Sequence, residues 1–471
     1  MKTKILIVIV VIILVASSIG VVMFLNNNDK SSIYIDVDLE VFGNADKDSK
    51  ISADDSKLVE RYISAVRDGD NDAIADLEKI MSKSFADANR DGVIDSKDVD
   101  QINGIVNNSA KKIWLLDGDG NERSVSTDVK RIGCEYYSNT ELCLILGLGD
   151  KIAAVDNAPY LYKDFYFSRE QQNGLVNMVN CSTPDFDFIN SLDLDTYLIF
   201  ASASGYVEKR DKIIDCDVLY LGLYNPDLTN TSKSNFIQGV LKAGYIFNTV
   251  DRAEEYVDWI IGYRDRLLNI ANSIPENQKP VVGMSNYNLT QYFGNESINT
   301  ITLYKPVDPL GQAVGLGGGH NVITDIIDSS FISNSAYGAS IQIDTVFNDD
   351  PNMNVDYFFL HMVKYTYGAS ITAGVPEHGY ITDDWSEITA AQIAASNCGL
   401  LENEKINLIA GDFRNGCTGG VLLGAYIGNI INPDHYKSID PIKMHNEYVA
   451  WMGVNGYNVS EDGVFISPKL P

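Results

Sequence analysis

A long hydrophobic run without charge begins close to the N-terminus and covers residues 5–25. Its 21 residues are enough to span a bilayer as a helix, and they exceed the usual hydrophobic core of a signal peptide. Lys2 and Lys4 precede the run, so the positive-inside rule predicts a cytoplasmic N-terminus and an extracellular remainder. We therefore expect a single-pass membrane anchor within residues 1–30. The alternative is a signal peptide cleaved near Ala16.

Further along the chain, apolar and polar positions follow each other as in a βαβ unit. A short strand at Ile132 leads into a helix that starts near Thr140, and Gly147 or Gly149 suits the left-handed end of that helix. A second, β-branched strand follows at residues 152–155. Such a unit predicts a parallel sheet with loops open at the carboxyl ends of its strands. Neither GxGxxG nor GxxxxGK[ST] follows the first strand, so a nucleotide site is not indicated.

A helical period marks the middle of the chain. Apolar residues recur there at three- and four-residue spacing: Ala253, Tyr256, Val257, Ile260, Ile261, Leu267 and Leu268. Asp251 near the start and Arg264 and Arg266 near the end complement the helix dipole. The apolar segment 281–284 then predicts the first strand of another α/β unit.

Two acidic segments have the spacing of twelve-residue calcium loops, with oxygen ligands at positions 1, 3, 5, 9 and 12 and a carbonyl at position 7. Residues 87–98 have Gly92 at position 6, where the chain turns sharply, whereas residues 44–55 lack this glycine and predict the weaker site. The expected ligands are Asp87, Asn89, Asp91, Val93, Asp95 and Asp98 in one loop, and Asn44, Asp46, Asp48, Lys50, Ser52 and Asp55 in the other. A single such loop also suits an acidic turn. Two copies, each followed by an amphipathic helix (57–66 and 97–106), favour calcium as a bound cofactor.

Length and composition restrict the classes of function. A chain of 471 residues predicts two or three domains, and its net charge of −28 argues against nucleic acid as a partner. Its six cysteines include no CxxC pair, so zinc is not indicated, and disulfides or buried thiols both stay open. All five histidines lie in the second half, which disfavours a bare transition metal held between two halves. GxSxG and HExxH are absent, and we expect no enzyme.

Several segments, in order, resemble the iron-siderophore and cobalamin type of solute-binding protein, the extracytoplasmic receptors of ABC importers. They are Arg131-Ile132, Ser138-Asn139-Thr140-Glu141, Leu146-Gly147-Leu148-Gly149-Asp150, Gly317-Gly318-Gly319-His320-Asn321 and an archaeal-like tail over 433–466. The resemblance covers about residues 112–471. It implies an α/β fold with two Rossmann-like lobes joined by one long helix, as in class III solute-binding proteins.

The calcium loops resemble those of dockerin modules, because position 12 is Asp and no helix precedes the first loop. Dockerins bind cohesins through a Ser-Thr pair at loop positions 10 and 11. Here these positions are Ala53-Asp54 and Ser96-Lys97, so a cohesin-like partner stays open. The expected organisation is an anchor (1–30), a dockerin-like calcium module (31–110), an N-terminal lobe (111–234), a connecting helix (235–278) and a C-terminal lobe (279–471).

Loops at strand ends supply the expected ligand-binding residues: Tyr136, Tyr137, Ser138, Asp156, Ser204, Tyr206, Ser285, Tyr287, His361 and Arg414. Rings beside hydroxyls and amides suit a bulky, partly apolar ligand such as an iron chelate, haem or corrinoid. The resemblance implies one permease-docking acid on each lobe, at Asp187 and Asp344, although Asp also suits a helix N-cap. We expect a membrane-anchored extracellular receptor that delivers its ligand to an ABC importer. The alternative is a calcium-dependent adhesion or scaffold protein.

Overall fold

The computed structural model describes residues 37–178, 181–201, 205–224, 227–228, 234–286, 300–326, 331–342, 355–361 and 405–468. The expected anchor at residues 5–25 lies outside these ranges. Within them, none of the helices combines the length and the apolar character that crossing a bilayer requires.

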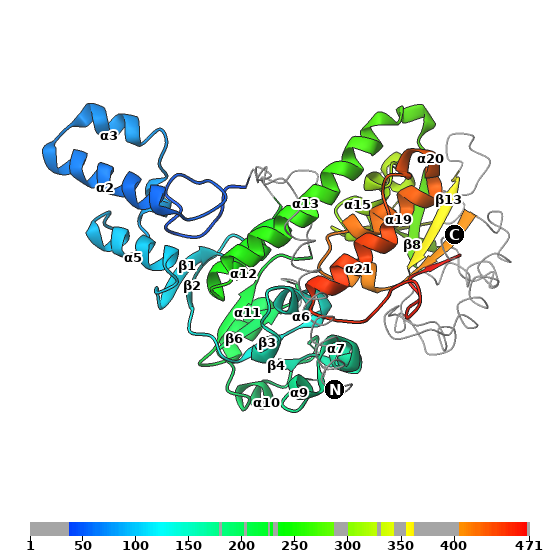
Figure 1. Cartoon of the computed structure of the whole chain (residues 1–471), viewed down its shortest axis with the longest axis horizontal. Helices are drawn as coiled ribbons and strands as arrows, with labels where there is room; N and C mark the ends of the chain where they lie inside the picture. Colours follow the sequence, from blue (N-terminus) through cyan, green and yellow to red (C-terminus); the bar gives the residue numbers. More distant parts are fainter. Residues whose placement is uncertain are drawn as a thin grey trace, which may run out of the picture. The chain divides into compact units, whose positions relative to one another are not determined.

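The first described part is a small helical unit, residues 37–110, which we call the N-terminal module (Figure 1). It contains α2 (Ala53–Asp68), α3 (Asn71–Leu77), α4 (Lys83–Ala86) and α5 (Ser96–Val106). The helices predicted at 57–66 and 97–106 are therefore confirmed; α2 is longer at both ends, and α5 begins one residue earlier. Phe42 stacks on Phe85 with ring centroids 4.8 Å apart, and Ile51 and Ile102 complete a small apolar core.

A two-stranded antiparallel hairpin follows the module. It consists of β1 (Lys112–Leu116) and β2 (Glu122–Ser126), in a register that pairs Lys112 with Ser126. An isolated bridge between Val41 and Leu115 joins the module to this hairpin. The module and the hairpin are thus connected by main-chain pairing as well as by sequence.

The first lobe is built on a five-stranded sheet in the order β5-β4-β3-β6-β7, in which every pair is parallel. Its strands are β3 (Ile132–Cys134), β4 (Ile152–Val155), β5 (Val176–Asn177), β6 (Thr196–Ile199) and β7 (Asp217–Tyr220). Its helices are α6 (Tyr136–Ile145), α7 (Asn157–Leu161), α8 (Lys163–Tyr166), α9 (Arg169–Gln172), α10 (Phe186–Asn190) and α11 (Tyr206–Lys212). The parallel βαβ unit predicted from the sequence is confirmed.

The start of α6 differs from the prediction. The helix begins at Tyr136, four residues before Thr140, with Glu135 at the N-cap position. Thr140 lies inside the helix, where its hydroxyl donates to the Tyr136 carbonyl at 2.8 Å. Of the two glycines proposed for the left-handed end, Gly147 adopts it, with φ of 75°.

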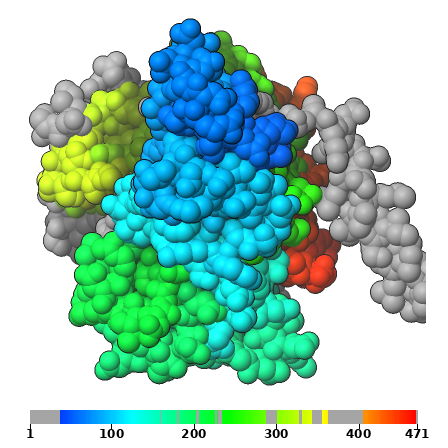
Figure 2. All heavy atoms as spheres, turned by 90° about the vertical axis from the view of Figure 1, so that its left-hand side faces the viewer, coloured from blue at the N-terminus to red at the C-terminus, as the bar shows by residue number. Residues whose placement is uncertain are grey.

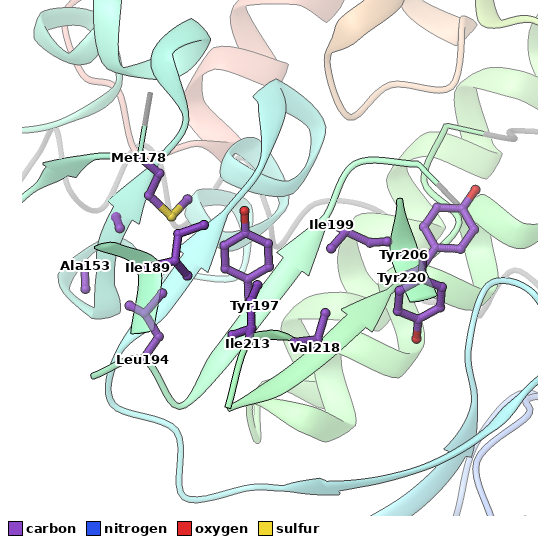
Figure 3. Packing of buried hydrophobic residues seen from close by; sticks show 11 residues of the cluster. Ala153, Met178, Ile189, Leu194, Tyr197, Ile199, Tyr206, Ile213, Val218 and Tyr220 are labelled. Carbon is purple, nitrogen blue, oxygen red and sulfur yellow. The ribbon is translucent and has the colours of Figure 1, made fainter. Parts of the chain in front are cut away.

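Figure 3 shows how the first sheet packs against its helices. Tyr197 and Ile199 of β6 lie beside Val218 and Tyr220 of β7, and Met178 closes the cluster near β4. These side chains are at most 5% exposed. A buried sheet of this kind holds the strand ends, and hence the loops that follow them, in fixed positions.

Two helices, rather than one, connect the lobes. They are α12 (Asn235–Ile246) and α13 (Val250–Ser273), which replace the single helix expected over 235–278. Asn248 has φ of 56°, a left-handed conformation that interrupts the helical path between them. The apolar positions predicted from the helical period fall on α13, where Ala253, Tyr256 and Ile260 are fully buried.

The second lobe contains a mixed sheet in the order β11-β12-β9-β8-β13-β14-β15, with β10 paired to β8. Its strands are β8 (Val281–Asn286), β9 (Thr300–Tyr304), β10 (His320–Asn321), β11 (Phe331–Asn334), β12 (Gly338–Gln342), β13 (Tyr357–His361), β14 (Ile406–Ile409) and β15 (Ile466–Ser467). Its helices are α15 (Pro309–Leu316), α18 (Asp412–Asn415), α19 (Val421–Ile431), α20 (Pro433–Tyr436) and α21 (Pro441–Trp451). β10, β8, β13 and β14 run parallel, so the Rossmann-like part of this sheet is its centre.

Candidate functional site

Aromatic side chains from both lobes meet beside the ends of the strands. We call this set the aromatic band: Tyr136, Phe200, Tyr224, Tyr304 and Tyr337. Ring centroids are 4.2 Å apart for Tyr136 and Phe200, 4.8 Å for Phe200 and Tyr224, and 5.3 Å for Tyr224 and Tyr337. The first three rings belong to the first lobe and the other two to the second, so the band crosses from one lobe to the other.

A charged pair lies within the aromatic band. The Arg414 guanidinium sits over the rings of Tyr224 and Tyr304, at 5.2 and 4.7 Å from their centroids. Its Nε and Nη2 atoms donate to Asp308 Oδ2 at 3.1 and 2.7 Å. Burial raises the pKa of Asp308, and the positive charge of Arg414 opposes that rise. The predicted ligand-binding arginine is therefore already neutralised by a carboxylate, which leaves an aromatic surface with little net charge.

A second buried charge fixes the loops of the first lobe. Glu135 follows β3 and forms an ion pair with Lys209 Nζ at 2.5 Å. Its Oε1 accepts from the Tyr197 hydroxyl at 2.8 Å, and its Oε2 accepts from the Phe200 amide at 2.9 Å. Burial raises the pKa of Glu135, and Lys209 counteracts this effect. Glu135 thereby joins the loops that carry Tyr136 and Phe200.

Most of the other predicted ligand-binding residues are buried and fill structural roles. Tyr137, Ser138 and Asp156 are 1–3% exposed, and the fully buried Ser285 hydroxyl donates to the Thr302 carbonyl at 2.7 Å. His361, at the end of β13, meets the Tyr304 ring edge-on at 6.3 Å. Ser204 and Tyr287 lie outside the described residues.

Tyr206 differs from its predicted place at the ligand site. Its hydroxyl donates to Asp117 Oδ2 at 2.8 Å and accepts from Arg123 Nε at 3.1 Å, so it faces the hairpin. The prediction missed Phe200, Tyr224, Tyr304, Tyr337 and the Asp308–Arg414 pair. The rule used for the other residues would have found Phe200 and Tyr224, because both come shortly after parallel strands.

The two lobes also meet at a buried carboxylate. Glu141, on α6, accepts at Oε2 from the Cys417 amide at 2.7 Å and from the Tyr448 hydroxyl, both in the second lobe. Its Oε1 accepts from the Tyr166 hydroxyl at 2.8 Å. Burial raises the pKa of Glu141 to about 7, against the effect of these hydrogen bonds.

The cysteines that the structure describes are free thiols. Cys134 and Cys143 are both buried, with their sulfurs 3.7 Å apart. Cys398 lies outside the described residues. Cys134, Cys143 and Cys417 match the buried-thiol alternative, whereas Cys181 and Cys216 are free thiols that are only partly buried.

Both calcium-type loops follow the same backbone path at position 4. Lys47 and Arg90 occupy this position and both have φ of 59°. At position 6 the loops differ, because Gly92 has φ of 88° whereas Ser49 does not have a positive φ. Of the two loops, residues 87–98 therefore have the left-handed glycine on which the predicted ranking rests, and the ranking itself stays a prediction.

The side-chain oxygens at position 1 test whether the loops suit a cation. Asn44 Oδ1 and Asp87 Oδ1 are buried, and neither has a hydrogen-bond partner in the part of the chain that the structure describes. A buried oxygen without a donor is costly unless a cation or water reaches it. Two such atoms at the same position of two loops fit calcium ligands.

The position-12 carboxylates have a second role that the sequence prediction missed. Asp55 and Asp98 complete capping boxes with Ser52 and Asp95 at the starts of α2 and α5. Burial and then repulsion by Asp46 raise the pKa of Asp55 to about 7, partly offset by hydrogen bonds from backbone amides. Within the described ranges, no three carboxylate, thiol or imidazole groups converge on one point. Cation binding therefore has to draw the loop carboxylates together.

Of the two proposed docking acids, Asp187 is described and Asp344 lies outside the described residues. Asp187 is exposed in the first turn of α10, and its carboxylate has no hydrogen bond or ion pair with any described residue. The N-cap of α10 is Asp185, whose side chain accepts from the Phe188 amide at 3.0 Å. The alternative that Asp187 serves as the N-cap is therefore wrong.

Comparison with known proteins concerns the fold. The sequence matches no protein-family model and no curated protein. The structure is similar to the TroA-like periplasmic binding protein FepB from Veillonella parvula, with a TM-score of 0.54 and 13% identity over 75% of this chain and 98% of that one. The fold is that of a TroA-like solute-binding protein.

A second solved structure supports the same fold. The molybdate periplasmic binding protein MolA of Haemophilus influenzae, solved with molybdate bound, gives a TM-score of 0.52 and 13% identity. The match covers 73% of this chain and 98% of MolA. The two α/β lobes expected from the sequence resemblance agree with the two sheets of the structure, and this second match supports the same mixed α/β fold.

Proposed function

We propose that this protein is an extracellular receptor that captures a bulky, partly apolar chelate or corrinoid and delivers it to an ABC importer. The aromatic band is the observation that carries this proposal. The partly exposed rings of Tyr136, Phe200 and Tyr337 provide apolar contacts from both lobes, and Tyr224 and Tyr304 lie buried within the band. The Asp308–Arg414 pair adds polar atoms without a large net charge. A ligand that touches both Tyr136 and Tyr337 contacts both lobes at once.

Fluorescence of the full-length chain in detergent tests this proposal. We expect quenching by at least one of three probes, namely a ferric siderophore, haemin or cyanocobalamin. Tyr224→Ala should weaken binding by on the order of tenfold, since it removes an aromatic contact at the centre of the band. Tyr62→Ala, in α2 of the module, is the control. No saturable quenching by any of the three would contradict a receptor for this class of ligand.

We propose that calcium is the cofactor of the two loops. Side-chain oxygens of Asp87, Asn89, Asp91, Asp95 and Asp98 and the Val93 carbonyl would hold one ion, and the matching atoms of residues 44–55 would hold the other. The buried oxygens at position 1 support this assignment. Asp91→Ala should remove most of the heat of a calcium titration, and unchanged heat would overturn the assignment.

We also propose that residues 5–25 keep the receptor at the outer face of the cell membrane. Tethering raises its effective concentration near a permease. N-terminal sequencing of the native protein decides between the alternatives. A mature N-terminus beyond Leu25 would identify a cleaved signal instead.

Asp187 is the docking acid that we propose for the first lobe, and Asp185 is its matched control. Asp187→Ala should reduce uptake into cells while ligand affinity and melting temperature stay unchanged, because its carboxylate is exposed and unpaired within the described chain. Asp185→Ala should instead destabilise the protein by about 1 kcal/mol and leave transport intact. The docking proposal is refuted if uptake is normal both in Asp187→Ala and in the double variant with Asp344→Ala.

A further inference from the structure

The first calcium-type loop contacts α12, the first of the two helices that connect the lobes. Ile51, at loop position 8, donates its amide hydrogen to the Tyr245 hydroxyl at 2.7 Å. Both residues are buried, with 6% and 5% of their surfaces exposed. Tyr245 lies near the end of α12, immediately before the turn at Asn248. The loop therefore contacts α12 close to the turn that leads into α13, the second of the two connecting helices.

A short strap ahead of the loop, residues 37–43, is held by the same helix. Gln238 of α12 donates from Nε2 to the Asp38 carbonyl at 2.6 Å and accepts from the Glu40 amide at 3.1 Å. One turn further, Lys242 Nζ pairs with Glu40 Oε2 at 2.8 Å. Gln238 and Lys242 are 5% and 1% exposed, so this contact excludes most water.

One side chain links the strap to the expected ion. Asn44 donates from Nδ2 to the Leu39 carbonyl at 2.7 Å and to the Asp48 carbonyl at 2.8 Å. Its other side-chain atom, Oδ1, is the buried position-1 oxygen that has no hydrogen-bond partner among the described residues. A cation held by this oxygen fixes the amide group, and the amide group in turn fixes the strap.

The second loop holds the hairpin of the first lobe. Arg90, at position 4, donates from Nε and Nη2 to the two oxygens of Glu122 in β2, at 3.0 and 2.7 Å. Its Nη1 donates to Asp87 Oδ2 at 3.2 Å, so the same arginine contacts the position-1 ligand. The guanidinium also lies over the Phe42 ring of the strap at 4.3 Å. Figure 2 shows the module in blue and the hairpin region in cyan as one continuous surface on this face.

We infer that the N-terminal module is a calcium-dependent brace of the first lobe, rather than a docking module that moves independently of it. This inference rests on the proposed calcium sites. Each loop reaches the lobe through a residue at a fixed loop position, Ile51 or Arg90, and each carries a buried, unsatisfied oxygen at position 1. Calcium that orders the loops must therefore also order α12 and β2.

Hydrogen exchange on the full-length chain, with calcium or with EGTA, tests the brace. Calcium should slow amide exchange in α12 and β2 by on the order of tenfold, since ion binding stabilises the state in which these contacts are made. Tyr245→Phe removes the acceptor of the Ile51 amide while keeping the ring. It should retain the heat of calcium binding and lose much of the calcium-dependent protection of α12.

Tyr263→Phe is the matched control, because its hydroxyl donates to Glu447 on α21 and not to the module. This variant should keep the full response of α12 to calcium. If calcium binding releases or takes up heat but does not change amide exchange in α12 or β2, the brace is wrong and the calcium sites stand. Absence of calcium heat would overturn the sites, and the brace with them.

Discussion

Two contacts of the first lobe, one with the second calcium-type loop and one with the second lobe, differ strongly in exposure. Toward the N-terminal module, the ion pair between Arg90 and Glu122 leaves 25% and 43% of the side chains exposed. Toward the second lobe, the Glu141 carboxylate is fully enclosed and accepts three hydrogen bonds. Exposed ion pairs contribute about 0–1 kcal/mol, whereas an enclosed carboxylate is sensitive to every donor around it. A bound ion could thus change the strength of the contact between the second loop and the hairpin. Protonation of Glu141 could change the strength of the contact between the lobes.

The largest effect should come from removing the enclosed carboxylate. Glu141→Ala removes the acceptor that Glu141 offers to the Tyr448 and Tyr166 hydroxyls and to the Cys417 amide, which keeps the Tyr448 hydroxyl as its second acceptor. At 1–3 kcal/mol for each unsatisfied group, partly relieved by rearrangement, we expect a loss of about 4 kcal/mol in denaturant unfolding at pH 6. Glu141→Gln keeps an acceptor of the same shape and is the control. A loss below about 1 kcal/mol would mean that this contact is not a strong one.

The next effect concerns pH. Because the pKa of Glu141 is about 7 in the folded protein and near 4.5 when unfolded, the folded state binds the proton more tightly. Proton binding by Glu141 therefore stabilises the folded protein fully below pH 4.5. This stabilisation, roughly 3 kcal/mol in total, is lost as the pH rises to 7. The slope of unfolding free energy against pH should therefore be flatter for Glu141→Gln than for the native chain. Equal slopes for the two proteins would contradict the raised pKa.

A smaller effect is expected at the first calcium loop. If calcium occupies this loop as proposed, Asp55, with a pKa of about 7, binds a proton in competition with the ion. Lowering the pH from 8 to 6 should weaken calcium binding to this loop by up to about tenfold, as measured by titration of Asp91→Ala, in which only this loop binds. Affinity that is independent of pH would exclude Asp55 as a ligand.

The smallest effect should follow from Arg90→Ala. The pair with Glu122 is partly exposed, so its loss should lower stability by no more than about 1 kcal/mol in the absence of calcium. If the module is a brace, the same variant should lose a larger share of the stabilisation that calcium provides. Equal losses with calcium and with EGTA would show that the pair acts independently of the ion.

Local patterns predicted the parts of this molecule that depend on neighbouring residues. The strand at 152–155, the period along α13 and the repeated oxygen spacing of the two loops each lie within a few turns of chain. The sequence did not reveal the break between α12 and α13, because a left-handed Asn248 is one conformation among several for that residue.

The contacts that give the candidate site its properties were not predictable in this way. Glu141 meets Cys417 across 276 residues and Tyr448 across 307, and Arg414 meets Asp308 across 106. Such pairs leave no periodic signal. Arg414 was correctly placed at the end of a strand, but its partner, and hence its loss of free charge, became visible only in three dimensions.

The backbone conformation of Tyr136 is unfavourable for a tyrosine. Its φ of 63° places a large side chain in the left-handed region, which costs a residue other than glycine about 1–2 kcal/mol. The ring beside Phe200 is therefore kept at the expense of folding stability, and a glycine at this position would be the easier residue to fold. If the proposed ligand is what the ring serves, proteins descended from this one that no longer bind it should have glycine or asparagine at this position before the buried sheet changes.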